Sequence, residues 1–182
     1  MSVALVSPPA APPVTLDALR EHLRITEPEE DVYLSDLLAA AAAHVEHASG
    51  RKLVSQAWRR YADHLPSDRS IALHLGPIRS VEAVTVYDRD GTPAQLVPAD
   101  WRLIDECLRL AGSVSAPNGI EIDVVCGYGD ASTDVPDHLR RAILMLAAHW
   151  YEFRGAVAPK DQPVSLPPGF EALVAPYRRV TL

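Results

Sequence analysis

The chain has 182 residues, of which 48% are hydrophobic, and a formal net charge of −7. That length is enough for one sizeable domain, or for a domain with an arm. The acidic balance argues against a protein that grips nucleic acid directly, because phosphate binding needs a basic surface. No apolar run approaches the roughly 20 residues that span a bilayer, and the first residues lack the basic start of a signal peptide. We therefore expect a soluble, unexported protein without membrane contact.

Residues 1–14 are rich in proline and alanine, and they predict a flexible N-terminal arm. A short helix is expected over residues 15–25, because Thr15 can cap its first turn and leucines recur on one of its faces. These leucines are Leu16, Leu19 and Leu23.

A longer helix is expected over residues 29–49. The stretch TEPE predicts a capping box, in which Thr26 caps the helix start and Glu29 reaches back to it, and Gly50 ends the helix. The alanines of LLAAAAA (37–43) allow a second helix to approach closely, either from the same chain or from another copy. The apolar positions recur at helical spacing, at Leu34, Leu38, Ala41, Val45 and Ala48.

The periodicity changes at about residue 54, where short apolar or alternating runs predict strands. The stretch DRDG (88–91) predicts a turn between two of them. The middle of the chain, about 54–130, is therefore expected to form a small antiparallel sheet or barrel inserted between helical segments. The predicted fold class is α+β, with a helical bundle as its body. The expected strands are 54–66, 71–75, 81–88, 101–104, 108–111 and 120–129.

The stretch VPDHLRRAILMLAAHWYEFRGAV predicts a helix over residues 135–154. Pro136 suits its first turn, and Gly155 is a natural end. An apolar stripe recurs at helical spacing, so Trp150 is expected to point inward while Arg140 and Arg141 lie on the polar side. The stripe consists of Leu139, Ala142, Ile143, Leu146, Ala147 and Trp150.

No set of residues has the spacing of a catalytic site, and we expect no catalysis, no cofactor and no metal. His44 and His47 stand three residues apart, whereas a zinc-binding helix more usually places its histidines four apart. Two alternatives stay open: a small metal-dependent hydrolase that uses His44, His47 and His149, and a module that binds a small molecule in the central sheet. Cys107 and Cys126, the only cysteines, are expected to be buried free thiols.

Residues 156–182 are expected to form a C-terminal arm, because a proline-rich spacer separates its apolar residues from the helical body. Large apolar side chains on an arm need a partner, and Arg178 and Arg179 offer charges for acidic groups on that partner. The alternative is that the arm folds back onto its own domain. The apolar arm residues are Phe170, Leu173, Val174, Tyr177 and Val180.

In their order and spacing, these segments resemble the phage head–tail connector proteins, or adaptors, of the gp6-like type. The resemblance runs from about Leu16 to Gly155 and defines an adaptor domain over residues 15–155. The inserted sheet departs from the simplest family members, which are largely helical. The segments that carry the resemblance are LDALREHLRI, EEDVYLSDLLAAAAAHVEHASGR, LHLGPIRSVEAVTVYDRDG and VPDHLRRAILMLAAHWYEFRG, and the ending LPPGFEALVAPYRR is also similar.

The resemblance implies a structural subunit of a tailed phage, a prophage or a gene transfer agent. Copies of it would form a homo-oligomeric ring, a dodecamer, in the neck of a particle assembled in the bacterial cytoplasm. The ring would join the portal protein to a tail-side stopper or terminator protein, and DNA would pass through its lumen without sequence-specific binding. The arm from Phe170 to Val180 would bind the portal. The expected subunit interface comprises Leu37, Ala40, Ala43, Arg140 and Arg141.

Overall fold

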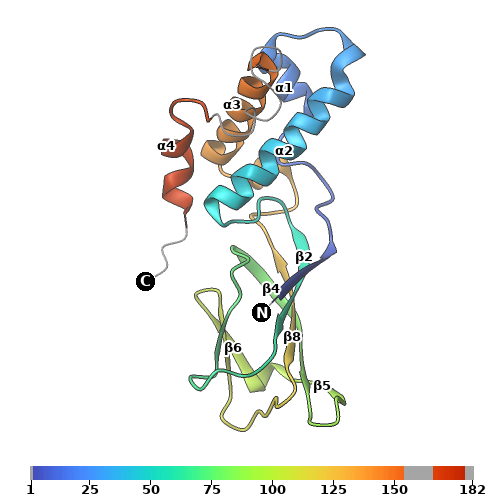
Figure 1. Ribbon diagram of the computed structural model, residues 1–182, viewed down its shortest axis with the longest axis vertical. Coiled ribbons are helices and arrows are strands. Elements are labelled where there is room, and N and C mark those ends of the chain that lie inside the picture. Colours follow the sequence, from blue (N-terminus) through green and yellow to red (C-terminus); the bar gives the residue numbers. More distant parts are fainter. Residues whose placement is uncertain (1, 154–165, 179–182) are drawn as a thin grey trace. The chain divides into compact units, whose positions relative to one another are not determined.

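The computed structural model describes residues 2–153 and 166–178. The chain divides into two compact units, each built from two separate segments. The strand unit comprises Met1–Ala10 and Ser55–Tyr128, and the helical unit comprises Ala11–Val54 and Gly129–Leu182. Figure 1 shows that strands dominate the first unit and helices the second.

The strand unit contains two antiparallel sheets. The larger sheet has the strand order β1-β2-β8-β4-β5, and the smaller one has the order β3-β7-β6. Their presence beside the helices confirms the predicted α+β class. The strands are β1 (Ser2–Ser7), β2 (Gln56–Ala62), β3 (Ser70–Ala72), β4 (Ile78–Tyr87), β5 (Pro93–Gln95), β6 (Trp101–Ile104), β7 (Cys107–Leu110) and β8 (Ile120–Cys126).

The alternating sequence of β8 explains why this strand lies at the centre of the larger sheet. Every second side chain, from Ile120 to Cys126, is buried, whereas Glu121 and Asp123 on the opposite face are half-buried. A strand with period-two alternation buries one face and leaves the other to solvent. The core of the strand unit contains Leu73, Val84, Leu108, Ile120, Ile122 and Val124 among its most buried members.

The prediction of a flexible arm over residues 1–14 is wrong for its first half. Residues 2–7 form β1, which pairs with β2 in antiparallel register, so that Val3 lies opposite Arg60. The free edge of β2 offers backbone hydrogen bonds, and the valines and leucine of β1 suit extended structure. Proline and alanine content further along the arm hid this strand, and β5 was missed because it has only three residues.

Helices α1 (Leu16–Leu23), α2 (Asp31–Ser49), α3 (Asp137–Phe153) and α4 (Phe170–Val174) form the helical unit. Figure 1 shows α2 and α3 side by side, with α1 and α4 packed against this pair. The pair buries Leu34, Leu38 and Val45 of α2 against the stripe predicted for α3. Among the helices described, none has both the length and the hydropathy of a membrane span.

The helix ends test three sequence predictions. The Thr15 hydroxyl accepts a hydrogen bond from Ala18 N at 3.3 Å, and Gly50 ends α2 with φ of 68°, as predicted. The capping box at Thr26 is wrong, because Pro28–Glu30 form a 3₁₀ turn before α2 and no side-chain hydrogen bond caps either start. Acidic side chains in this turn instead stabilise the start of α2, because negative charge is favourable at the positive end of the helix dipole. Gly155 lies outside the described residues.

Candidate functional site

The packing of α2 on α3 leaves the opposite face of α2 uncovered. Since buried positions recur at Leu34, Leu38, Ala41 and Val45, the residues half a turn away point outward. Val32 is 78% exposed. We call this surface the α2 ridge; it consists of the exposed residues Val32, Asp36, Ala40, Ala43 and His47.

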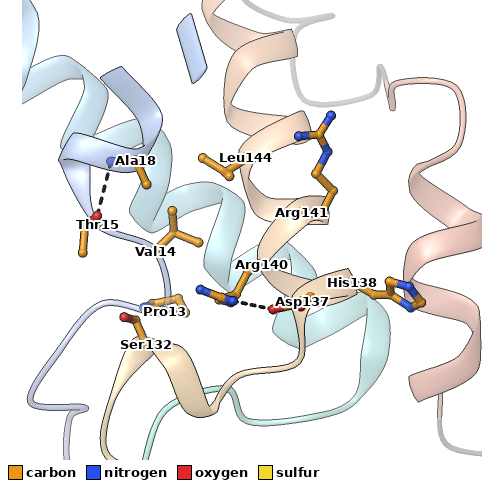
Figure 2. A pocket seen from close by; sticks show the side chains of 10 residues that line it. All are labelled: Pro13, Val14, Thr15, Ala18, Ser132, Asp137, His138, Arg140, Arg141 and Leu144. Atoms are coloured by element: carbon orange, nitrogen blue, oxygen red, sulfur yellow. Dashed lines mark hydrogen bonds and ion pairs between the residues drawn. The ribbon is translucent and has the colours of Figure 1, made fainter. Parts of the chain in front are cut away.

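A groove of about 540 Å³ lies between the start of α1 and the first half of α3 (Figure 2). Its apolar wall includes Val14 and Leu144, and Arg140 and Arg141 supply positive charge. One NH2 group of Arg140 pairs with Asp137, and its buried Nε has no hydrogen-bond partner among the described residues. We call this surface the α1–α3 groove; it is lined by Pro13, Val14, Thr15, Ala18, Ser132, Asp137, His138, Arg140, Arg141 and Leu144.

The five residues predicted to form a subunit interface lie on these two surfaces or beside them. Ala40 and Ala43 are exposed on the α2 ridge, and Leu37 is half-buried beside it. Arg140 is half-buried and Arg141 is exposed in the α1–α3 groove. The ridge and the groove share no residue, so one chain presents two separate surfaces.

The N-terminal side of the groove was missed by the sequence reasoning. Pro13, Val14 and Thr15 were assigned to the flexible arm or to a simple cap, yet Val14 is only 5% exposed. A signal was present, because Val14 and Leu19 stand before and after the cap at the spacing of a hydrophobic staple. Both side chains are buried in the helical unit.

The predicted free C-terminal arm is wrong for its described part, and the alternative of an arm folded back onto its own domain is confirmed there. Phe170 and Val174 are 0% exposed, and Leu173 and Tyr177 are half-buried. Burying two large apolar side chains on the body is more favourable than leaving them in water. Arg179 and Val180 lie outside the described residues.

Polar contacts also hold the end of this segment against α2. The carbonyl oxygen of Tyr177 accepts a hydrogen bond from Arg51 Nε at 3.1 Å, and Arg178 Nε donates to the Ala48 carbonyl at 3.3 Å. Arg178 is exposed and also pairs with Glu171. Of the predicted portal-binding residues that are described, Arg178 is the most accessible.

The three histidines of the metal-site alternative lie in different surroundings. His44 lies between Trp150 and Phe170, with ring centroids 6.1 and 5.5 Å away. His149 contacts Phe153, whereas His47 is exposed on the α2 ridge. In the described part of the chain, no three histidine, cysteine, aspartate or glutamate side chains are placed to hold a metal. Cys107 is half-buried and Cys126 is buried, both as free thiols.

A charged network lies on the outer face of the larger sheet. Arg59 Nε and one NH2 group donate to the two carboxylate oxygens of Asp123, at 2.6 and 2.7 Å, and Glu121 lies 3.4 Å from the other NH2 group. The hydrogen bond to Asp123 raises the pKa of Arg59. A hydrogen bond to Glu121 is the main cause that raises the pKa of Tyr87. These contacts explain how β2, β8 and β4 are tied together on their polar side.

Comparisons with known proteins support the resemblance to head–tail connector proteins. The family model of the phage gp6-like head-tail connector protein matches residues 13–91, which is less than half of the chain. No curated protein matches the sequence.

Three solved structures are similar over the whole chain, and each match covers 97% of the other chain. One is the neck of an empty GTA particle computed with C6 symmetry, at 26% identity and a TM-score of 0.83. The second is the virion of a native gene transfer agent particle, at 25% identity and 0.81. The third, the neck of a native GTA particle computed with C12 symmetry, has 24% identity and a TM-score of 0.80, which is evidence for the fold.

Proposed function

We propose that the chain is a structural subunit of the gp6-like head–tail connector type and that it forms a ring in the neck of a phage-like particle. The similar neck was computed with C6 symmetry, which accommodates a ring of six or twelve copies. We favour the dodecamer implied by the sequence resemblance. Assembly in the bacterial cytoplasm is part of the same proposal.

The observation that carries this proposal is that one helical unit bears both an uncovered ridge and a groove. The α2 ridge projects from the helix surface, with alanines at positions 40 and 43 and with Val32 at 78% exposure. The α1–α3 groove is concave, partly apolar and positively charged at Arg140 and Arg141. When the ridge of one copy enters the groove of the next, the contact is heterologous, and such contacts close into rings around an axis.

Charge and shape both support this contact. Asp36 on the α2 ridge offers a carboxylate, and Arg141 in the α1–α3 groove is exposed without an ion-pair partner among the described residues. Alanines at positions 40 and 43 allow close approach of a neighbouring backbone. The interface proposed here keeps Ala40, Ala43, Arg140 and Arg141 and adds the N-terminal residues Pro13–Thr15.

The ring would join the portal protein on one side to a tail-side stopper or terminator protein on the other. We propose that the surface around Arg178, together with Arg179 and Val180, contacts the portal. Phe170 and Val174 support that surface from inside the helical unit and do not touch the portal themselves. Many weak contacts around a ring give high avidity.

The function is architectural, and we propose that the chain has no catalytic activity and uses no cofactor. DNA would pass through the lumen without sequence-specific contacts, in keeping with the net charge of −7, since a negative surface repels phosphate.

Particles assembled without this protein test the proposal. We expect filled heads that lack tails, and we expect purified protein added to them to restore tail attachment. Electron microscopy of the restored particles should show the chain as a ring between portal and tail. Firmly attached tails on particles that lack the chain would contradict the proposal.

A further inference from the structure

Two arginines of the strand unit lie opposite each other, and neither has an ion-pair partner among the described residues. Arg102 on β6 and Arg109 on β7 are directly opposite in the antiparallel register. Both side chains are exposed, and in the described part of the chain neither has a hydrogen bond or an ion pair. They point to the same face of the small sheet, because directly opposed residues share a face.

Like charges directly opposite across two strands destabilise a sheet. The outer face of the larger sheet shows the usual solution, where Arg59 on β2 lies opposite Asp123 on β8 and forms a two-point ion pair. No such acid stands opposite Arg102, so the small sheet keeps an arrangement that costs stability in the isolated chain. A bound anion removes that cost.

A surface groove of about 280 Å³ contains both arginines. Trp101 and Ile104 contribute apolar surface to it, and Ile104 is 39% exposed. A ligand of this groove therefore meets two guanidinium groups beside apolar side chains. The lining is completed by Ala99, Asp100, Leu110 and Ala111.

We propose that this groove docks an acidic segment of another protein, one whose carboxylate bridges Arg102 and Arg109 while an adjacent apolar side chain covers Ile104. Guanidinium groups bind carboxylates through paired, charge-assisted hydrogen bonds. A nucleic acid fits less well, because Asp100 lines the groove and Asp105 follows β6 directly. A run of phosphates would be repelled by these carboxylates. A single protein carboxylate would meet less of this repulsion. The proposal does not depend on ring formation.

Binding of a labelled peptide that carries one glutamate next to a leucine in an otherwise glycine–serine sequence, followed by fluorescence anisotropy on the full chain, tests the groove. We expect saturable binding that weakens as salt is raised. Replacing both arginines, as Arg102→Thr with Arg109→Thr, should weaken binding about tenfold or more, because charge-assisted hydrogen bonds are lost. Threonine suits an exposed strand position, and removing like charges should keep or raise the melting temperature.

Two control variants separate the groove from general electrostatics. Arg89→Thr removes an exposed charge from the β4–β5 turn of the same unit and should leave binding unchanged. Arg102→Lys with Arg109→Lys keeps the charge and should retain part of it. Equal binding by the double threonine variant, absence of binding by the natural chain, or preference for a short duplex DNA over the glutamate–leucine peptide would each overturn the proposal.

Discussion

The ring of Phe170 lies against the ring of His44, with centroids 5.5 Å apart and planes inclined at 58°. The two residues come from α4 and α2, so this contact fixes the described C-terminal segment to the C-terminal half of α2. Phe170 is fully buried. The segment that looks like a free arm in the sequence is therefore part of the body of the helical unit.

Replacing Phe170 with alanine should strongly destabilise the helical unit. Deleting a buried phenylalanine side chain costs about 3–5 kcal/mol, because transfer energy is lost and a cavity remains. Urea unfolding followed by circular dichroism at the helical signal measures this loss. Glu171→Ala is the matched control, since Glu171 is exposed, and it should change stability by less than about 0.5 kcal/mol. Equal effects of the two substitutions would mean that α4 is not docked in solution.

Placing a charge on the α2 ridge should block ring formation while the subunit still folds. Ala43→Arg introduces a longer side chain with the same sign of charge as Arg140 and Arg141 of the groove, at an exposed helix position where arginine is a good helix former. We expect an unchanged melting temperature, and loss of rings in electron micrographs of neck assemblies. Ala94→Arg on exposed β5 is the control and should assemble normally. Rings of normal size from the Ala43 variant would exclude the ridge from the interface.

The ion pair between Arg59 and Asp123 should contribute measurably to the strand unit. Both side chains are partly exposed, at 36% and 27%, so solvent screening limits the contribution of this two-point pair to about 1 kcal/mol. Asp123→Asn should lower the free energy of unfolding by that amount at low salt and by less at high salt. Asp90→Asn, in an exposed turn, should have no effect. A loss for Asp123→Asn that is independent of salt would contradict an electrostatic role.

Tyr87 should titrate above the ordinary tyrosine pKa of 10.0. Its hydroxyl donates to the Glu121 carboxylate, which raises the pKa, and partial desolvation acts in the same direction. A raised pKa means that the folded state holds this proton more firmly than the unfolded state. The stabilisation is thus present below pH 10 and disappears as the pH rises through the folded-state pKa.

Ultraviolet titration of tyrosine absorbance measures this shift. The difference between the natural chain and Tyr87→Phe isolates one tyrosine from the six in the sequence. Glu121→Gln removes the acceptor's charge and should bring the titration of Tyr87 back towards 10. If Tyr87 already titrates with the other tyrosines in the natural chain, the hydrogen bond to Glu121 is not formed in solution.

The two long helices of the helical unit, α2 and α3, were predictable because their packing leaves a regular pattern. Leu34, Leu38 and Val45 on α2, and Leu139 and Leu146 on α3, repeat at the period of a helix, and each is buried. Thr15 and Gly50 marked two boundaries correctly because their roles are local. Thr26 failed because Pro28 and the acidic residues after it form a 3₁₀ turn first.

The strand β1 and the position of α4 were not predictable by such reasoning. Every side chain of β1 is exposed, so no alternation of buried and exposed residues marks it. The place of Phe170 depends on tertiary packing of α4 against α2 and α3, and no local pattern reveals that packing. The α1–α3 groove was found only in part for the same reason, since Arg140 and Val14 are far apart in the sequence and meet through tertiary packing.

Because the helical unit is built from two separate segments, its parts become available for folding at different times during translation. Ribosomes synthesise α1 and α2 first and α3 only after the whole strand unit, because Ser55–Tyr128 lies between them. Until α3 emerges, the apolar face of α2 at Leu34, Leu38 and Val45 lacks the helix that covers most of it. Nascent chains with such a face are targets for chaperones and are prone to aggregate. The helical unit must therefore complete its fold after translation of the strands, while the strand unit has all its residues available earlier.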